Sequence, residues 1–253
     1  MNRIRIYYLV CTLLTVQSVY SQVGPLWQAA KDAEVVQAYQ KAYNWFTANN
    51  SYAFKLKYTS FKNHTSAEVK EVSEGYCKRI NHKYRTVALG TLMVQNEMYR
   101  AVIDTLDKFI VFTDPDKGVP VMADSKVMLD LLKNTRALKK KKESNKTTYR
   151  IEFNKNSLYE AYEFTVNDKG FLEKLVYYYS EQTEERFEST KNESPVKIKT
   201  KPRLEITFDS YEVPAKITEN DFMEKNIVAD AKKIVLLNKY KGYGIKDYRH
   251  ANN

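Results

Sequence analysis

The sequence predicts an α+β protein that is mostly β, with one large curved antiparallel sheet (a half-open barrel) and helices covering its concave face. Most of the chain consists of runs in which apolar and polar residues alternate, separated by short polar turns. Two stretches instead place apolar residues three and four positions apart, which is the spacing of amphipathic helices. The order is a helix, about five strands, a second helix and about five more strands, and a curved sheet with helices on one face satisfies that order.

The N-terminal 21 residues have the pattern of a secretory signal peptide. Arg3 and Arg5 provide a positive start, residues 6–16 form an uncharged apolar stretch, and Val19-Tyr20-Ser21 permits cleavage after residue 21. The apolar stretch is shorter than the roughly 20 residues of a transmembrane helix. We therefore expect residues 1–21 to be removed and residues 22–253 to form a single soluble domain, exported to the periplasm or secreted from a Gram-negative cell.

The first half of the mature chain begins with an amphipathic helix. We predict this helix over Gln28 to Ala48, with an apolar stripe formed by Val35, Val36, Tyr39, Ala42, Tyr43 and Phe46. Strands are then predicted at Tyr52–Tyr58, Val69–Ile80, His82–Leu89, Glu97–Thr105 and Lys108–Thr113. A second helix is predicted to begin near Asp124 or Ser125 and to bury Val127, Met128, Leu131 and Leu132.

The second half contains a basic run followed by further strands. We interpret Arg136 to Lys142 as a solvated loop. Strands are predicted at Tyr149–Phe153, Leu158–Val166, Phe171–Tyr179 and Arg203–Tyr211, with a last one at Lys233–Asn238. Asn167-Asp168-Lys169-Gly170 is typical of a hairpin turn, and residues 181–196 are polar and charged enough to predict a mobile segment.

The net charge of the chain indicates which binding partners it would attract. The formal charge of +10 includes Arg3 and Arg5 of the leader, and the remaining excess would attract anionic partners. Nucleic acid is not expected outside the cytoplasm. One interpretation of Lys139, Lys140, Lys141 and Lys142 is therefore a contact for anionic headgroups, and the other is a simple solvated run.

Cys11 leaves with the leader, so Cys77 has no partner within the mature chain. A buried thiol is the simplest interpretation of Cys77.

Several segments resemble the periplasmic lipoprotein-carrier (LolA-like) superfamily, whose members form a half-open β-barrel lidded by helices. The predicted first helix leads directly into Ser51-Tyr52-Ala53-Phe54-Lys55-Leu56-Lys57-Tyr58, and Gly75-Tyr76 lies in a following strand. Tyr99 to Asp104 ahead of Lys108 to Phe112 is similar to the central strands of that family. Arg203 to Phe208, followed by Asp221-Phe222, is similar to its late strand and downstream element. The resemblance implies a carrier for lipids, lipoproteins or another amphiphile.

A carrier of this kind would bury acyl chains against the concave face of the sheet. The chain contains 20 tyrosines and 11 phenylalanines, which suit such a face, although any packed strand also prefers aromatic residues. The resemblance, rather than composition, favours an open cavity over a filled core. The residues expected to line it are Tyr52, Phe54, Leu56, Tyr58, Tyr162, Phe164, Phe171, Leu175, Tyr177, Leu204, Ile206 and Phe208.

No catalytic constellation is present in the sequence. The three histidines have no cysteine or second histidine at metal-ligand spacing, and neither a phosphate-binding loop nor a nucleophile motif occurs. We therefore predict a protein that is not an enzyme and has no metal or organic cofactor. The alternative to a carrier is an envelope scaffold or assembly subunit with a filled core, whose edge or loops bind a protein partner.

Overall fold

The computed structural model describes residues 25–116, 125–186, 196–230 and 233–249. The predicted leader, residues 1–21, lies outside them. The helices are α2 (Asp32–Ala48) and α3 (Ser125–Leu132), with short 3-10 turns η1 (Glu219–Phe222) and η2 (Asn238–Tyr240). No helix in the described ranges has the length and apolar character needed to cross a membrane.

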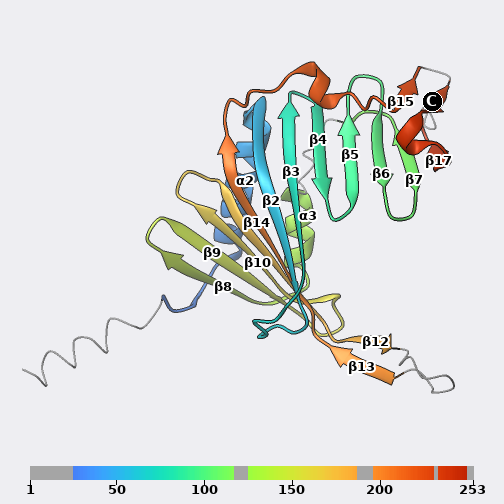
Figure 1. Cartoon of the computed structure of the whole chain (residues 1–253). Helices are drawn as coiled ribbons and strands as arrows, with labels where there is room; N and C mark the ends of the chain where they lie inside the picture. The colour runs from blue at the N-terminus through green and yellow to red at the C-terminus, as the bar shows by residue number, and fades with distance from the viewer. Residues whose placement is uncertain (1–24, 117–124, 187–195, 231–232, 250–253) are drawn as a thin grey trace, which may run out of the picture.

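A 13-stranded sheet dominates the molecule, in the order β1-β8-β9-β10-β11-β14-β2-β3-β4-β5-β6-β7-β17 (Figure 1). Its first strands in the chain are β1 (Gln28–Ala29), β2 (Ser51–Phe61), β3 (Val69–Ile80), β4 (Lys83–Ala88), β5 (Thr91–Gln95), β6 (Arg100–Asp104) and β7 (Phe109–Thr113). The later ones are β8 (Thr135–Glu143), β9 (Lys146–Phe153), β10 (Tyr159–Asn167), β11 (Leu172–Tyr179), β14 (Arg203–Glu212) and β17 (Gly244–Asp247). The sheet is curved and open, and the predicted fold class is confirmed.

The two halves of the chain meet where β14 pairs with β2. Ile206 lies opposite Tyr58 there, and Phe208 lies opposite Leu56. Because strands paired in register turn partner residues to the same face, this pair joins the two halves into one continuous surface. The helix α2 lies against one face of that surface, which we call the concave face.

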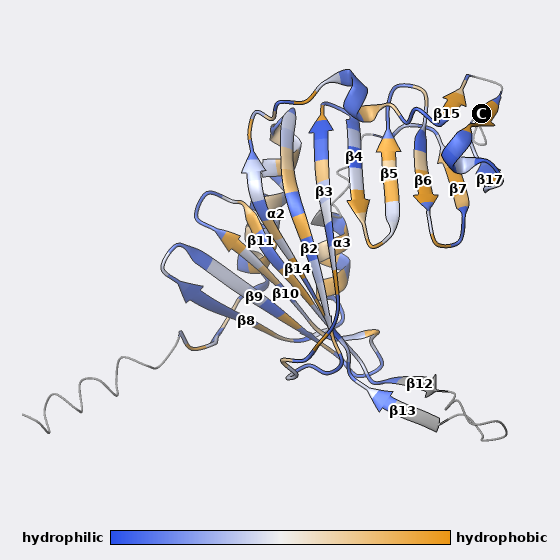
Figure 2. Ribbon diagram, in the orientation of Figure 1, coloured by the Kyte–Doolittle hydropathy of each residue, from blue (hydrophilic) through white to orange (hydrophobic). Residues whose placement is uncertain are grey.

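A second hydrophobic core lies on the opposite face, over β4 to β7. Residues of β5, β6 and β7 pack there against the C-terminal segment, which contains β15 (Ile227–Ala229), β16 (Ile234–Leu236) and η2. Cys77 lies in the core on the concave face and stands opposite Thr86 in the pairing of β3 with β4. Val87, the next residue along β4, therefore points to the other face of the sheet, toward the second core. Hydrophobic residues occupy much of β5 to β7 (Figure 2). Residues 227–229 and 234–243 therefore cover this face of the sheet.

Some predicted elements are wrong in position or kind. The first helix begins at Asp32, because Gln28 and Ala29 pair with β8. The predicted basic loop is strand β8, whose lysines pair in register with β9. A strand at Thr91–Gln95 is missed, and the strand predicted to start at Glu97 begins at Arg100. The last predicted strand is shorter than expected and pairs with β15 in a separate two-stranded sheet.

The polar segment after β11 also contains regular structure. Its ends form β12 (Gln182–Arg186) and β13 (Val196–Thr200), which pair as a two-stranded arm projecting from the sheet (Figure 1). Residues 187–195 lie outside the described ranges. We call the end of the sheet that carries this arm the arm end. The opposite end carries the turn between β10 and β11. The predicted hairpin turn is confirmed there, and Gly170 adopts a φ of 90°, a backbone conformation that suits glycine.

Candidate ligand-binding face

Side chains on the concave face line up in rows across the central strands. The strand registers define one row as Tyr149, Phe164, Leu175, Ile206 and Tyr58. They define a second row, nearer the arm end, as Ile151, Tyr162, Tyr177, Leu204 and Ser60. The structure thus brings residues from both halves of the predicted set together on one face.

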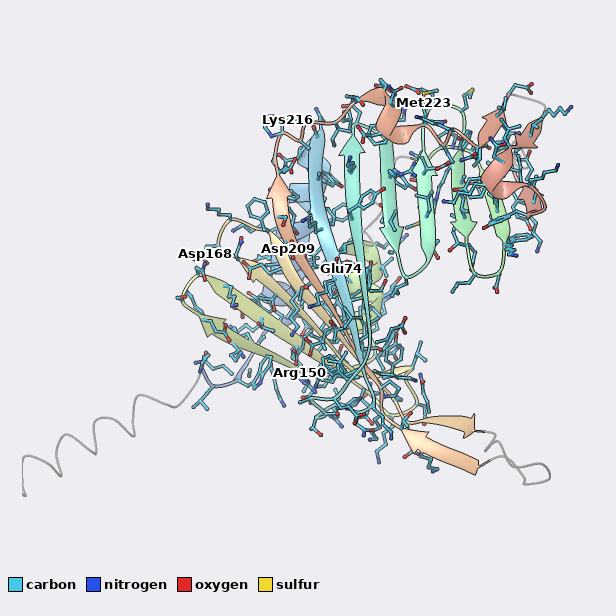
Figure 3. All side chains as sticks on the ribbon, viewed as in Figure 1. Glu74, Arg150, Asp168, Asp209, Lys216 and Met223 are labelled. Atoms are coloured by element: carbon cyan, nitrogen blue, oxygen red, sulfur yellow. The ribbon has the colours of Figure 1, made fainter. Side chains whose placement is uncertain are left out.

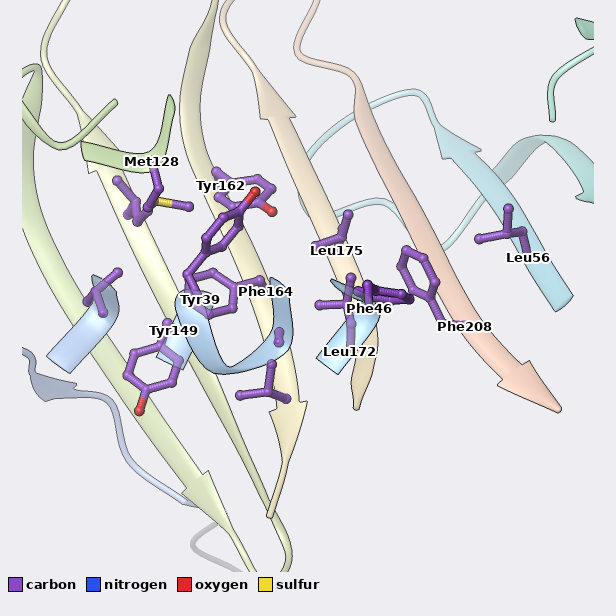
Figure 4. Packing of buried hydrophobic residues seen from close by; sticks show 14 of the residues in the cluster. Tyr39, Phe46, Leu56, Met128, Tyr149, Tyr162, Phe164, Leu172, Leu175 and Phe208 are labelled. Atoms are coloured by element: carbon purple, nitrogen blue, oxygen red, sulfur yellow. The ribbon is translucent and has the colours of Figure 1, made fainter. Parts of the chain in front are cut away.

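The helix α2 fills much of this face (Figure 4). Its Tyr39 ring lies edge-on to Phe164, with centroids 5.7 Å apart, and its Phe46 ring lies 5.8 Å from Phe54. Seven residues of the predicted set are consequently buried: Tyr52, Phe54, Leu56, Tyr162, Phe164, Leu175 and Phe208. These side chains form a packed core beneath the helix, so the expectation of a wholly open concave face does not hold for them.

Four other predicted residues are only half-buried and lie together toward the arm end. They are Tyr58, Tyr177, Leu204 and Ile206, which we call the arm-end strip. Tyr177 pairs with Leu204, and Ile206 pairs with Tyr58, so the strip crosses β11, β14 and β2 without a gap. Three of its members pack against the edge of the buried core, and α2 does not bury them as it buries their neighbours.

Two further tyrosines, Tyr159 and Tyr179, extend the strip, and the sequence pattern places Tyr159 on the wrong face. Simple alternation along β10 puts Tyr159 on the face opposite to Tyr162. A register shift between Tyr159 and Ala161 returns Tyr159 to the concave face, where its ring lies 5.5 Å from that of Tyr177. Tyr179 pairs with Tyr159, and their rings are 5.1 Å apart. A β-bulge of this kind has no reliable signal in a single sequence.

The tyrosines of the strip are held neutral. Removal from water raises the pKa of Tyr58 to about 12 and that of Tyr177 to about 12. Burial also raises the pKa of the Tyr162 hydroxyl, at the border of the strip, well above its ordinary value. At neutral pH these groups therefore act as hydrogen-bonding tips on apolar rings, which suits contact with an amphiphile.

The short helix α3 presents more apolar surface than it buries. Met128 is buried in the concave core and lies near Tyr162 (Figure 4), and Leu132, one turn later, is partly buried there. Val127 and Leu131 form the neighbouring stripe, with exposed fractions of 47% and 37%. The predicted second helix is confirmed in position, but only half of its predicted apolar face is packed.

Phe171, the remaining predicted residue, lies at the other end of the sheet beside a pocket of about 590 Å3. Phe171, Phe208 and Tyr211 supply its aromatic wall, and Asn145, Asn167, Asp168, Lys169 and Glu173 supply its polar side. Asp168 marks the tip of the β10–β11 turn (Figure 3). The Tyr211 hydroxyl donates a hydrogen bond to the Leu172 carbonyl, and Trp45 packs behind Phe171 at a centroid distance of 4.7 Å. Phe171 therefore does not share a site with the arm-end strip.

The basic run is largely neutralised by carboxylates of the same chain. Lys139 Nζ lies 2.8 Å from Glu152, and Lys141 Nζ lies 2.9 Å from Glu143. Lys140 Nζ lies 2.6 Å from Glu34 of α2, which joins the edge of the sheet to the helix. Because residues in a strand alternate between faces, the run does not present one continuous positive surface.

Cys77 is buried, which limits the reactivity of its thiol. Burial raises the pKa of the Cys77 thiol to about 12, so it remains protonated at neutral pH and packs as a small apolar group. Within the part of the chain that the structure describes, no three histidine, cysteine or acidic side chains are close enough to hold a metal ion. The arrangement is suited to burying apolar groups.

No family model matches the chain, and no curated protein matches it. Similar solved structures include a LolA superfamily protein from Nitrosomonas europaea, with 9% identity, a TM-score of 0.31, and coverage of 74% of this chain and 96% of that one. A DUF1329 family protein from Desulfovibrio piger has 9% identity, a TM-score of 0.30 and coverage of 74% and 96%. A domain described as an outer membrane lipoprotein-sorting protein from Vibrio parahaemolyticus has 12% identity, a TM-score of 0.26 and coverage of 74% and 97%. These TM-scores are too low to support a functional assignment, which rests on the geometry of the chain itself.

Proposed function

We propose that the mature protein, residues 22–253, is a non-catalytic periplasmic carrier or binding protein for an amphiphile, such as a lipid or the acyl chains of a lipoprotein. The observation that supports this most strongly is the arm-end strip. A row of apolar and aromatic side chains that is core beneath α2 continues beyond the helix with half-buried residues. An apolar surface that continues from a core without a cover is typical of a site that binds an apolar partner.

The strip and α3 together account for how an acyl chain would be held. The chain would lie across β11, β14 and β2, against Tyr177, Leu204 and Ile206. Val127 and Leu131 of α3 provide exposed apolar surface for a lid over it. Burial of each methylene contributes about 0.8 kcal/mol, so even a short length of chain gives useful affinity. The packed residues beneath α2 would support the site rather than contact the ligand.

A series of acyl probes of increasing length tests this proposal. Each added methylene should tighten binding roughly fourfold until the site is full. Ile206→Glu should abolish binding, because an unpaired carboxylate on an apolar face is strongly disfavoured. Val72→Glu is the matched control, because Val72 is an exposed apolar residue on the opposite face of the sheet, in strand β3, which is separated from β14 by β2. Absence of any chain-length dependence in the folded protein would contradict the proposal.

The alternative function is an envelope scaffold that binds a protein partner. The filled region beneath α2 favours it, because a packed core leaves the surface of the molecule as its means of binding. A scaffold predicts no acyl binding and a stable protein complex on co-purification. The lysines of β8 (Lys139, Lys140, Lys141 and Lys142) remain a proposed contact for anionic headgroups, and their pairing with carboxylates leads us to expect a small contribution, mostly at low salt.

A further inference from the structure

The C-terminal segment that covers the second core presents an apolar row on its outer side. Ile234 and Leu236 pack inward against that core, so Val235 between them points outward, together with its cross-strand partner Val228. Leu237 follows in extended backbone and continues the outward row. Val228, Val235 and Leu237 are 54%, 37% and 37% exposed. The inner side of the segment is therefore packed, and the outer side carries apolar side chains without a cover.

Lysines flank this apolar row. Lys233 is exposed at the turn that joins β15 to β16. Lys239 and Lys241 stand on either side of Tyr240, whose side chain is fully buried in the second core, and both lysines are exposed. Because the inner side of the segment lies against the sheet, these side chains project from its outer side. We call the following six residues the cap surface: Val228, Lys233, Val235, Leu237, Lys239 and Lys241.

The lysine charges of the cap surface are available to a partner. Among residues 25–116, 125–186, 196–230 and 233–249, none of the three lysines forms an ion pair with a carboxylate. The ammonium group of Lys239 lies over the ring of Tyr240, 5.2 Å from the centroid, and this contact leaves its charge uncompensated.

Acidic residues of the same segment cancel only part of this charge. Glu224 is buried and pairs with Arg85 of β4, and Asp247 pairs with Arg249. Asp230 is the remaining acidic residue in the part of the segment that the structure describes, and its carboxylate accepts a hydrogen bond from a backbone N–H of the β15–β16 turn. Three lysines against one carboxylate leave a net positive surface, which attracts an anionic partner.

The residue types of the cap surface favour a lipid surface over a protein partner. Protein–protein interfaces are depleted in lysine and enriched in aromatic residues and arginine, and the cap surface consists of lysine, valine and leucine. On an anionic membrane, aliphatic side chains can enter the boundary between headgroups and acyl chains while ammonium groups stay beside the phosphates. Lysines next to aliphatic side chains match that arrangement.

We propose that the cap surface docks the protein on an anionic membrane surface. This inference goes beyond the proposed function, because it concerns how the whole molecule lies on a membrane and not what the concave face binds. The cap surface belongs to the segment on the face of the sheet opposite to α2, and that segment lies far from the arm (Figure 1). Docking therefore leaves the arm-end strip uncovered.

Co-sedimentation with vesicles tests the inference. Vesicles of phosphatidylethanolamine and phosphatidylglycerol provide an anionic surface, and vesicles of phosphatidylethanolamine and phosphatidylcholine provide a neutral one. We expect tighter binding to the anionic vesicles, and this preference should shrink as salt is raised, because exposed charges are screened. Each lysine beside an anionic membrane contributes about a fivefold gain in affinity.

A double variant, Lys239→Gln with Lys241→Gln, should weaken binding to the anionic vesicles about 25-fold at low salt. Val235→Ser with Leu237→Ser should weaken it as well, and that loss should persist at high salt, because it removes apolar contact. The matched control is Lys55→Gln with Lys57→Gln, which removes the same charge from exposed residues of β2 and should change binding little. Circular dichroism and acyl-probe binding should be unchanged in the Lys239→Gln, Lys241→Gln protein, which shows that it is folded.

Four results would overturn the inference. The folded wild-type protein binds neither kind of vesicle, or it binds both equally. Both lysine variants lose the same affinity, which makes net charge alone the cause. Soluble polyglutamate binds the protein as tightly as the anionic vesicles do, which makes the surface a site for an acidic polypeptide. The wild-type protein forms dimers in the absence of vesicles and Val235→Ser with Leu237→Ser abolishes them, which makes a second copy of the chain the occupant.

Discussion

Leu175 and Leu204 offer a matched test of which part of the concave face is core and which part is open. Both are leucines on adjacent strands, both point to the concave face, and they differ in exposure: Leu175 is 5% exposed, whereas Leu204 is half-buried. Leu→Ala removes three carbons, worth about 2.4 kcal/mol of transfer free energy when fully buried, and a cavity adds to this. We therefore expect Leu175→Ala to lower the free energy of unfolding by about 3–4 kcal/mol.

Leu204→Ala should cost only about 1 kcal/mol, because roughly half of the transfer free energy applies and no closed cavity forms at a half-exposed site. Urea denaturation followed by circular dichroism measures both losses, with unchanged slopes showing that unfolding remains comparable. Acyl-probe affinity should respond in the opposite order, weakening for Leu204→Ala and remaining unchanged for folded Leu175→Ala. Equal stability losses would refute the division of the face into packed and open parts.

Two further predictions concern the second core and acid stability. Phe112 is fully buried in the second core, so Phe112→Ala should cost about 3–5 kcal/mol. If residues 22–253 form one domain, that variant should shift the unfolding transition reported by the fluorescence of Trp27 and Trp45; an unchanged transition would indicate two independent units. The hydrogen bond from Lys78 lowers the pKa of Asp221, so its stabilisation is present above the ordinary carboxylate pKa of about 4 and is lost as the pH falls through the lowered value. Asp221→Asn should therefore reduce the acid-induced loss of stability, measured by urea titration between about pH 2 and pH 6, and an unchanged pH profile would exclude this pair as a contributor.

The strands with uninterrupted alternation could be predicted from the sequence because their two faces differ in burial. In β2, Tyr52, Phe54 and Leu56 are buried and Lys55 and Lys57 are exposed, as alternation requires. For the lysine run in β8 the sequence predicts a loop, because propensity and charge both disfavour a strand there. Its strand form depends on pairing with β9 and on carboxylates such as Glu34, which is distant in the sequence.

The candidate site could be predicted only in part, because exposure depends on where a helix lies. The alternation predicts which residues share the concave face, and Phe54 and Ile206 do share it. It carries no information on which of them α2 covers, so a buried Phe54 and a half-buried Ile206 look alike in the sequence.

Native mass spectrometry of the protein purified from its own cells tests the carrier function most directly. We expect the wild-type protein to carry an added mass that matches an amphiphile, and to lose that mass together with acyl-probe binding in Ile206→Glu. Val72→Glu, on the opposite face, should retain it. A wild-type protein that is always found as the bare polypeptide, or only as part of a stable protein complex, would contradict the carrier function and favour a scaffold.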